Sequence, residues 1–242
     1  FMRKEMSDAH VFGMDEMLLA DADVPASANL ESLDRVTVTD AYCNPSGGPL
    51  DTRTDGNMYG KTRQTEASWM DAGHTGHNDG SDRALTTAML DDMIEGVMTN
   101  GANYNDLIML TGHDTYMNIQ QLLTKGGDGG AATILRYEQN AAAAGSVNGV
   151  VGQAGLNYDS RVGSYNGIPI FVSQHVTKDT TSRIHLLDLP QMALRVAAPT
   201  TYVANDNLAV TQSLVKQFAL ITAMELICYR FNTSGSVRDL NA

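Results

Sequence analysis

The sequence predicts an α+β fold, with helical patterns concentrated in its first half and strand patterns in its second. Apolar side chains recur three or four residues apart in residues 81–99 and 115–125, which is the spacing of one face of a helix. Runs rich in β-branched and aromatic residues occupy residues 168–172, 184–188 and 218–231, which is typical of strands. Both kinds of element are therefore expected to share one core.

An N-terminal helix is expected over residues 2–19. Met6 and Met17 belong to an apolar series with a spacing of three or four residues, as on an amphipathic helix. The helix is expected to end before Pro25, because the residue before a proline is pushed out of the helical region. We assign residues 1–24 to this N-terminal unit.

Residues 25–82 are expected to form an irregular segment that makes contacts. The segment is rich in Gly, Asp, Thr, Asn and Pro, and only Arg35–Thr39 alternates as a strand does. A long irregular stretch inside a compact domain is usually a functional or contact-making loop. Trp69, the only tryptophan, is expected to anchor the segment to a core or to a neighbouring subunit.

Residues 83–242 are assigned to an α+β core that begins with a helix. Ser81 or Asp82 is the expected cap of this helix, which runs to about Thr99. Asn100–Gly101 is expected to end it.

A buried strand and a second helix are expected to follow. Leu107–Leu110 is a short apolar run, and Asp114 is placed to cap a helix over Thr115–Lys125. The pair His113–Asp114 could also be catalytic, because it follows a strand as active-site residues of α/β enzymes do. The helix cap explains the same residues without chemistry.

The strand patterns of the second half are bounded by clear turn signals. Asn166–Gly167 predicts a tight turn before the strand Ile168–Val172, and Pro169 indicates a sheet edge or a strand start. Phe218–Phe231 is apolar on both alternating faces, as expected of a strand covered on both sides. Its β-branched and aromatic residues favour a strand over a buried helix.

Residues 141–155 are a tract of small residues. The tract is too apolar for a free linker and too poor in large side chains for a core. We therefore expect an adaptable loop at a subunit contact, with Gly145, Val150 and Gly155 as contact residues beside Trp69.

The overall charge is strongly acidic. With 16 basic and 28 acidic residues, the chain carries a formal net charge of −12. Such a chain repels phosphate backbones, which argues against groove-reading of nucleic acid. Cys43 and Cys228 are expected to be free thiols, with Cys228 buried. No apolar run approaches the roughly 20 residues that span a bilayer, so a soluble protein made in the cytosol is expected.

One loop suggests metal chemistry. Histidine suits zinc and carboxylates suit calcium or magnesium, so His74, His77 and Asp79, with Asp71 or Asp82 nearby, could hold a divalent ion. The spacing matches no named metal motif, and the glycines between the ligands argue for a polar surface loop. We therefore assign no metal site, and keep these three residues as candidates.

Other catalytic constellations are not supported. Ser173, His175 and Asp188 would supply the residue types of a triad, but the serine is not followed by a helix start and no Gly-x-Ser-x-Gly elbow is present. His185 lies in an apolar strand pattern and is interpreted as a packed histidine. Phosphate-loop and dinucleotide fingerprints are absent, so no catalytic or cofactor-binding residue is assigned.

The order of the elements from Ala84 onward resembles a known family. A glycine turn leads into Ile168-Pro169-Ile170, then come Ile184–Asp188, the segment Met192–Val196 and a long closing strand over Phe218–Phe231. This order is similar to the C-terminal part of the major capsid proteins of tailed double-stranded DNA phages, the Hong Kong 97 fold that encapsulin compartments also use.

The resemblance implies a structural shell protein rather than an enzyme. Residues 1–24 would be the end of the family's spine helix, and the N-terminal arm and extended loop that precede it would lie outside this chain. The first residue is Phe1, which indicates a processed chain or a fragment. Subunits would join as pentamers and hexamers into an icosahedral container that encloses double-stranded DNA without sequence-specific binding. The protein would be found in the virion, without a membrane, after synthesis in the host cytoplasm.

Two alternatives remain open at this point. The first is a metal-dependent enzyme that uses the His74 and His77 loop. The second is an encapsulin-like compartment, which shares the fold but holds a protein cargo.

Overall fold

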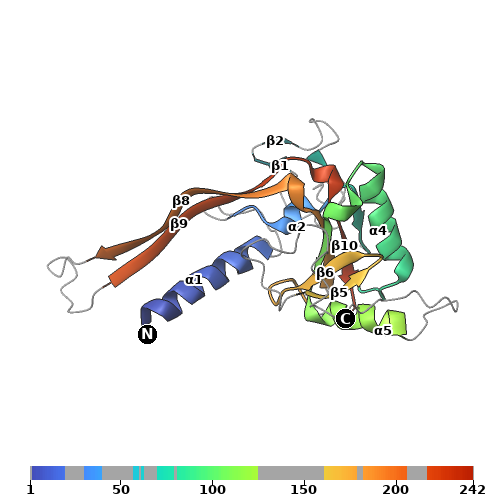
Figure 1. Cartoon of the computed structure of the whole chain (residues 1–242), viewed down its shortest axis with the longest axis horizontal. Helices are drawn as coiled ribbons and strands as arrows, with labels where there is room; N and C mark the ends of the chain where they lie inside the picture. Colours follow the sequence, from blue (N-terminus) through green and yellow to red (C-terminus); the bar gives the residue numbers. More distant parts are fainter. Residues whose placement is uncertain are drawn as a thin grey trace.

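A computed structural model of the chain describes residues 2–19, 30–39, 57–59, 61–62, 70–78, 81–124, 161–178, 182–205 and 217–241. These residues form a body built around a mixed sheet, and an arm that projects from it (Figure 1). The expected mixture of helices and strands is confirmed.

The body is organised around a sheet of six strands. Their order across the sheet is β3-β10-β7-β4-β6-β5, in which β10 and β3 are parallel, β4 and β6 are parallel, and the other neighbours are antiparallel. The strands are β3 (His74–Gly76), β4 (Leu107–Thr111), β5 (Arg161–Tyr165), β6 (Ile168–Val172), β7 (Ser182–Asp188) and β10 (Gly235–Leu240). The last strand of the chain therefore lies inside the sheet, between β3 and β7.

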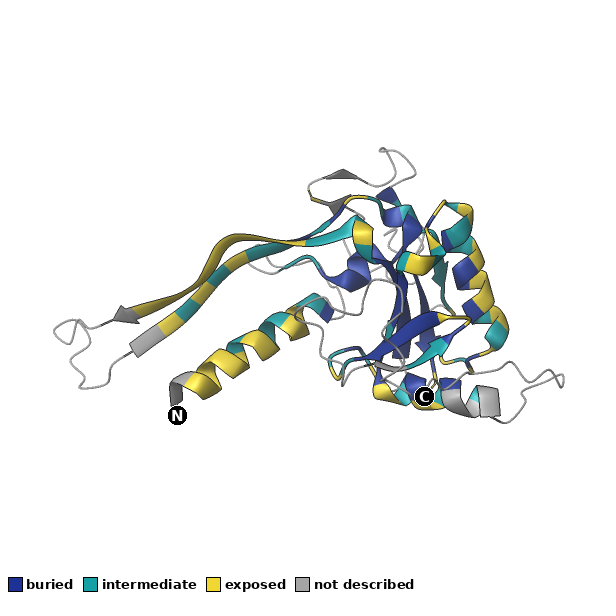
Figure 2. Cartoon of the chain, in the orientation of Figure 1, coloured by how far each residue is buried: buried dark blue, intermediate teal, exposed yellow. Residues whose placement is uncertain are grey.

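Both faces of the sheet are covered. On one face α4 (Thr87–Thr99) and α5 (His113–Thr124) contribute buried side chains such as Leu90 and Ile119 to a core that includes Met109. On the other face Ile108 packs with the end of the N-terminal helix and with the root of the arm. Alternate residues of β4 thus enter two different cores, which explains why this central strand is apolar from Leu107 to Leu110 and mostly buried (Figure 2).

The region predicted as a strand over residues 35–39 instead contains the end of a short helix, α2 (Leu33–Val36), and the turn that follows it. Ser32 caps it, because its hydroxyl oxygen accepts a hydrogen bond from the Arg35 amide at 3.4 Å. The Thr37 hydroxyl donates to the Leu33 carbonyl oxygen at 3.1 Å and ends the turn. These local side-chain bonds outweighed the alternating pattern on which the prediction rested.

A buried ion cluster fixes α2 to the sheet. The Asp34 side chain is fully buried, and its carboxylate lies 2.7 Å from the Arg183 guanidinium of β7. The Arg238 guanidinium of β10 donates a hydrogen bond to the same oxygen. One carboxylate on α2 therefore binds two adjacent strands, and it does so where water cannot screen the charges.

The hairpin between β5 and β6 confirms the turn prediction. Asn166 and Gly167 both have positive φ, 49° and 86°, as a tight two-residue turn with the favoured twist requires. Pro169 lies at the start of β6 and before its pairing with β4, which begins at Ile170. The expected strand start is confirmed, whereas an edge position is wrong, because β6 lies between β4 and β5.

Two helix starts differ from the predictions. The helix expected to start near residue 82, α4, begins at Thr87 with Thr86 as its cap. Arg83 instead pairs with Leu240 in an isolated β-bridge. The helix ends at Asn100 and Gly101 as expected.

The helix expected after Asp114, α5, begins at His113, so Asp114 lies inside its first turn instead of capping it. The Asp114 carboxylate accepts a hydrogen bond from the Ser182 hydroxyl and ties this helix to β7.

The arm contains the remaining long elements. It consists of α1 (Met2–Leu19) and a two-stranded antiparallel ribbon, β8 (Met192–Asn205) and β9 (Gln217–Cys228). The apolar run 218–231 is a strand to Cys228 as predicted, but the expectation that it is covered on both sides is wrong, since Ile221 is 55% exposed. It is also not the closing strand, because β10 follows it.

Short elements complete the described chain. A small hairpin joins β1 (Asn57–Met58) to β2 (Lys61–Thr62), and single 3-10 turns occupy Tyr104–Asp106, Leu189–Gln191 and Phe231–Thr233. Cys228 is buried as expected, and Cys43 lies outside the described residues. The proposed division at residues 24 and 82 stays a prediction.

The ion cluster generates a stability prediction. Replacing Asp34 with Ala leaves two arginines in a buried site without this carboxylate, so the free energy of unfolding should fall by about 3–5 kcal/mol. Urea denaturation followed by circular dichroism measures the change. The control Glu95→Ala, on the exposed face of α4, should shift stability by no more than about 0.5 kcal/mol. A loss below about 1 kcal/mol for Asp34→Ala would show that the cluster does not anchor α2.

Candidate assembly surface

The arm, defined as α1, β8 and β9, is the most unusual surface of the protein. The ribbon projects from the body with α1 beside it, and exposed residues follow both along much of their length (Figures 1 and 2). An isolated two-stranded ribbon is only marginally stable in water. A ribbon of this length therefore needs contacts beyond its own hydrogen bonds.

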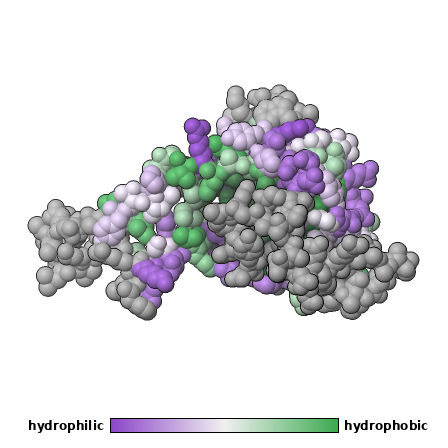
Figure 3. All heavy atoms as spheres, in the orientation of Figure 1, coloured by the Kyte–Doolittle hydropathy of each residue, from purple (hydrophilic) through white to green (hydrophobic). Residues whose placement is uncertain are grey.

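Exposed apolar side chains concentrate on the arm. Nine of the twelve large apolar residues that are exposed in the described part of the chain belong to it, which are Met6, Val11, Phe12, Met17, Leu194, Val196, Tyr202, Val203 and Ile221. Apolar surface also extends along the ribbon toward the body in the space-filling view (Figure 3). A concentration of this kind marks a protein contact surface.

The N-terminal helix is attached to the rest of the molecule at three places. At its C-terminal end Leu19 is buried in the second core. In its middle, the His10 imidazole lies 2.8 Å from the Thr222 hydroxyl of β9. Elsewhere on the helix surface, the rings of Phe12 and His175 pack in a T-shaped arrangement. The His175 imidazole also lies 3.6 Å from the Asp15 carboxylate. The rest of the helix is largely exposed.

A tyrosine holds the root of the ribbon. The Tyr59 hydroxyl donates to the Leu226 carbonyl oxygen at 2.7 Å and accepts from the Cys228 amide at 3.1 Å. Burial, opposed by the bond from Cys228, raises the pKa of Tyr59 above its usual value, so the hydroxyl stays protonated and can donate. The small hairpin thereby satisfies backbone groups of β9 next to the body.

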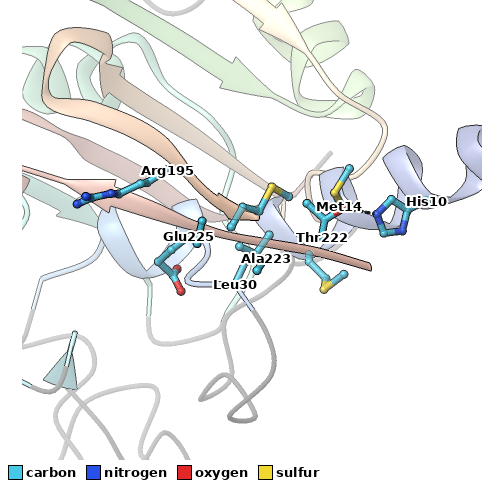
Figure 4. A pocket seen from close by; sticks show the side chains of 10 residues that line it. His10, Met14, Leu30, Arg195, Thr222, Ala223 and Glu225 are labelled. Atoms are coloured by element: carbon cyan, nitrogen blue, oxygen red, sulfur yellow. Dashed lines mark hydrogen bonds between the residues drawn. The ribbon is translucent and has the colours of Figure 1, made fainter. Parts of the chain in front are cut away.

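A groove of about 450 Å³ lies where α1 meets the ribbon. It is lined by His10, Met14, Met17, Leu30, Arg195, Ala197, Thr222, Ala223, Met224 and Glu225 (Figure 4). Three methionines make its walls adaptable, since their unbranched thioether side chains fit irregular partners.

The charges at this groove are arranged unexpectedly. Arg195 and Glu225 lie directly opposite each other on β8 and β9, a position from which opposite charges usually pair. Glu225 instead accepts hydrogen bonds from the amides of Glu31 at 2.9 Å and Leu226 at 3.1 Å. Arg195 is left exposed, with no ion-pair partner among the residues that the structure describes.

The histidine loop does not assemble a metal site among the described residues. His74 lies in β3 and His77 follows it, Asp79 lies outside the described residues, and no described group of three His, Cys, Asp or Glu side chains could hold an ion. Burial lowers the pKa of His74; Arg83 acts in the same direction and Asp92 opposes it. A partly buried, preferentially neutral histidine at a sheet edge fits a structural role.

The other sequence candidates are also dispersed. His175 contacts α1, Ser173 accepts a hydrogen bond from the His175 amide, and Asp188 ends β7 beside Ser234. His185 is buried and its ring lies 2.9 Å from the Thr37 hydroxyl, which confirms a packed histidine. The four contact candidates Trp69, Gly145, Val150 and Gly155 lie outside the described residues and stay predictions.

Sequence reasoning missed the arm and its polar residues. Arg195, His10 and Tyr59 belong to no motif, and the apolar run of β9 was interpreted as buried. The polar residues Thr222 and Glu225 inside the apolar run of β9 were the available signal. None of the described helices combines the length and apolarity needed to cross a bilayer.

The shifted pKa of His74 gives a pH prediction. The unfolded chain binds the His74 proton more readily than the folded one, so this residue favours folding at neutral pH, and the contribution is lost as pH falls below about 6.5. The increase in unfolding free energy from about pH 5 to pH 7 should be smaller in His74→Gln than in the unsubstituted chain. Equal increases would contradict this. A metal ligand would behave differently, since zinc would raise Tm and His74→Gln would remove the rise.

Of the comparisons with known proteins, only the one with solved structures found similar chains. No family model matches the chain, and no curated protein matches it. The structure is similar to a chain of the cyanophage A-1(L) capsid asymmetric unit, with a TM-score of 0.63, 17% identity, and coverage of 98% of this chain and 67% of that chain.

Two further solved structures are similar at lower scores. The holo-SrpI encapsulin complex from Synechococcus elongatus PCC 7942 gives a TM-score of 0.40 and 13% identity, over 84% of this chain and 59% of that chain. The satellite phage P4 procapsid including the size determination (Sid) protein gives 0.42 and 10%, over 99% of this chain and 63% of that chain. The chain thus spans about two thirds or less of each neighbour. The cyanophage likeness concerns the whole described fold, and the chain has the Hong Kong 97 capsid fold that its element order indicated.

Proposed function

We propose that the chain is a subunit of a closed icosahedral shell that encloses double-stranded DNA. The observation that carries this proposal is the arm, whose exposed apolar side chains need cover that the described part of the same chain does not provide. The capsid fold supports it, because proteins of this fold include the cyanophage capsid chain. Its role is structural, and we assign it no catalytic or cofactor site.

The geometry suits repeated subunit contacts. The body is rigid, since its sheet is buried on both faces and α2 is fixed to it by the Asp34 cluster. The arm is the exposed, elongated part. A rigid body with a projecting contact surface can join copies head to tail, and such contacts close into rings when the rotation per copy allows it. Pentamers and hexamers are the rings that an icosahedral shell requires.

The charge of the chain supports enclosure of DNA without tight binding. At a net charge of −12 the subunit repels phosphate backbones, so it would confine DNA rather than hold it. We place the assembled protein in the virion and its synthesis in the host cytoplasm. Trp69 and the small-residue tract with Gly145, Val150 and Gly155 are proposed as further subunit contacts.

Electron cryo-microscopy of the protein as isolated tests the proposal. We expect closed particles with fivefold and sixfold clusters of subunits, and nuclease-protected double-stranded DNA inside those isolated from infected cells. Closed particles that contain a protein and no DNA would indicate an encapsulin-like compartment instead. Discrete small particles at every concentration would contradict a shell of either kind.

A further inference from the structure

We propose that the groove between α1 and the ribbon is a docking site for α1 of a second copy of this chain, with Arg195 as the residue that selects the partner. This inference rests on the proposed function in one respect, namely that copies of the chain associate. The inference adds which surfaces of the two copies meet and which oppositely charged residues pair across the contact.

The electrostatic argument begins with Arg195. Its natural cross-strand partner, Glu225, uses its carboxylate for two backbone amides. Arg195 is therefore an exposed cation at the edge of an apolar groove, without an ion-pair partner in the described part of the chain. Because copies with a net charge of −12 repel one another, a contact between them gains most where a cation of one meets a carboxylate of the other.

Two of the four carboxylates of α1, those of Glu5 and Asp8, are placed to meet such a cation only on another copy. His10, Met14 and Met17 line the groove, so they mark the inner side of the helix. At about 100° per residue, Glu5 and Asp8 point roughly to the opposite side. Both are exposed and neither has an ion-pair partner among the described residues. The helix thus cannot present them to its own groove.

The apolar surfaces of the two partners also match. Val11 is 58% exposed and lies three residues after Asp8, so both side chains occupy neighbouring positions on the helix surface. A second copy that brings Asp8 to Arg195 would bring Val11 to the groove. There Met14 and Met224 can adapt to an aliphatic side chain. Burial of this patch would cover part of the exposed apolar surface of both arms.

Charge reversal tests the contact. In the full chain, Arg195→Glu should weaken self-association by about tenfold or more, because it replaces an attraction by a repulsion. Sedimentation velocity over a range of concentrations measures association, and circular dichroism verifies that the variant is folded. The milder Arg195→Ala should weaken association less. Lys178→Glu is the matched control, since it changes the net charge equally at an exposed lysine outside the arm, and it should associate more strongly than Arg195→Glu.

Rescue identifies the partner. Adding Glu5→Lys or Asp8→Lys to Arg195→Glu should restore association, whereas either lysine alone should weaken it. Equal association of Arg195→Glu and the Lys178→Glu control would overturn the proposal, as would failure of both double variants to recover.

The same experiments separate this inference from the proposed function. Shells that form equally well with Arg195→Glu would leave the shell function in place and overturn the docking site. Small oligomers that depend on Arg195 but never close would support the docking site and contradict the shell. A chain that stays monomeric at every concentration would overturn both.

Discussion

The buried carboxylate of Asp34 is the interaction on which the rest of the structure depends. It joins α2 to β7 and β10 at a point that water does not reach, and it does so through two guanidinium groups from adjacent strands. Through this cluster the second face of the sheet acquires a fixed cover, to which the end of α1 and the root of β9 are packed. The arm therefore leaves the body in a defined direction rather than from a loose hinge.

This arrangement separates two kinds of surface in one chain. The body buries its apolar residues on both faces of the sheet, as a self-sufficient domain does. The arm leaves them exposed, as one half of an interface does, and its groove combines methionines with an uncompensated arginine. The acidic charge makes copies of the chain repel one another, whereas this apolar surface with its arginine favours their association at one place. A subunit of a shell requires this combination of a rigid body and a selective contact.

Sequence reasoning found the elements whose signals are local. Asn166–Gly167 fixes a turn through backbone conformation alone, and Asn100–Gly101 ends a helix for the same reason. Features that depend on residues distant in the sequence could not be predicted from local patterns. The alternation in Arg35–Thr39 predicted a strand, but Ser32 and Asp34 hold a helix there. The apolar run of β9 predicted burial, whereas Ile221 is exposed, because the exposure of a strand face depends on what packs against it and not on its own sequence. The pairing of Glu225 with backbone amides, which frees Arg195, likewise depends on the position of Glu31.

The central claim is that other copies of the chain cover the arm. Hydrogen–deuterium exchange of the dispersed subunit and of the assembled protein tests it directly, because the backbone amides of α1, β8 and β9 can be followed separately from those of the central sheet. We expect the amides of the arm to gain strong protection on assembly, while those of β4, β7 and β10 change little, since they are already buried in the single subunit. An arm that exchanges equally fast in both states would contradict the account.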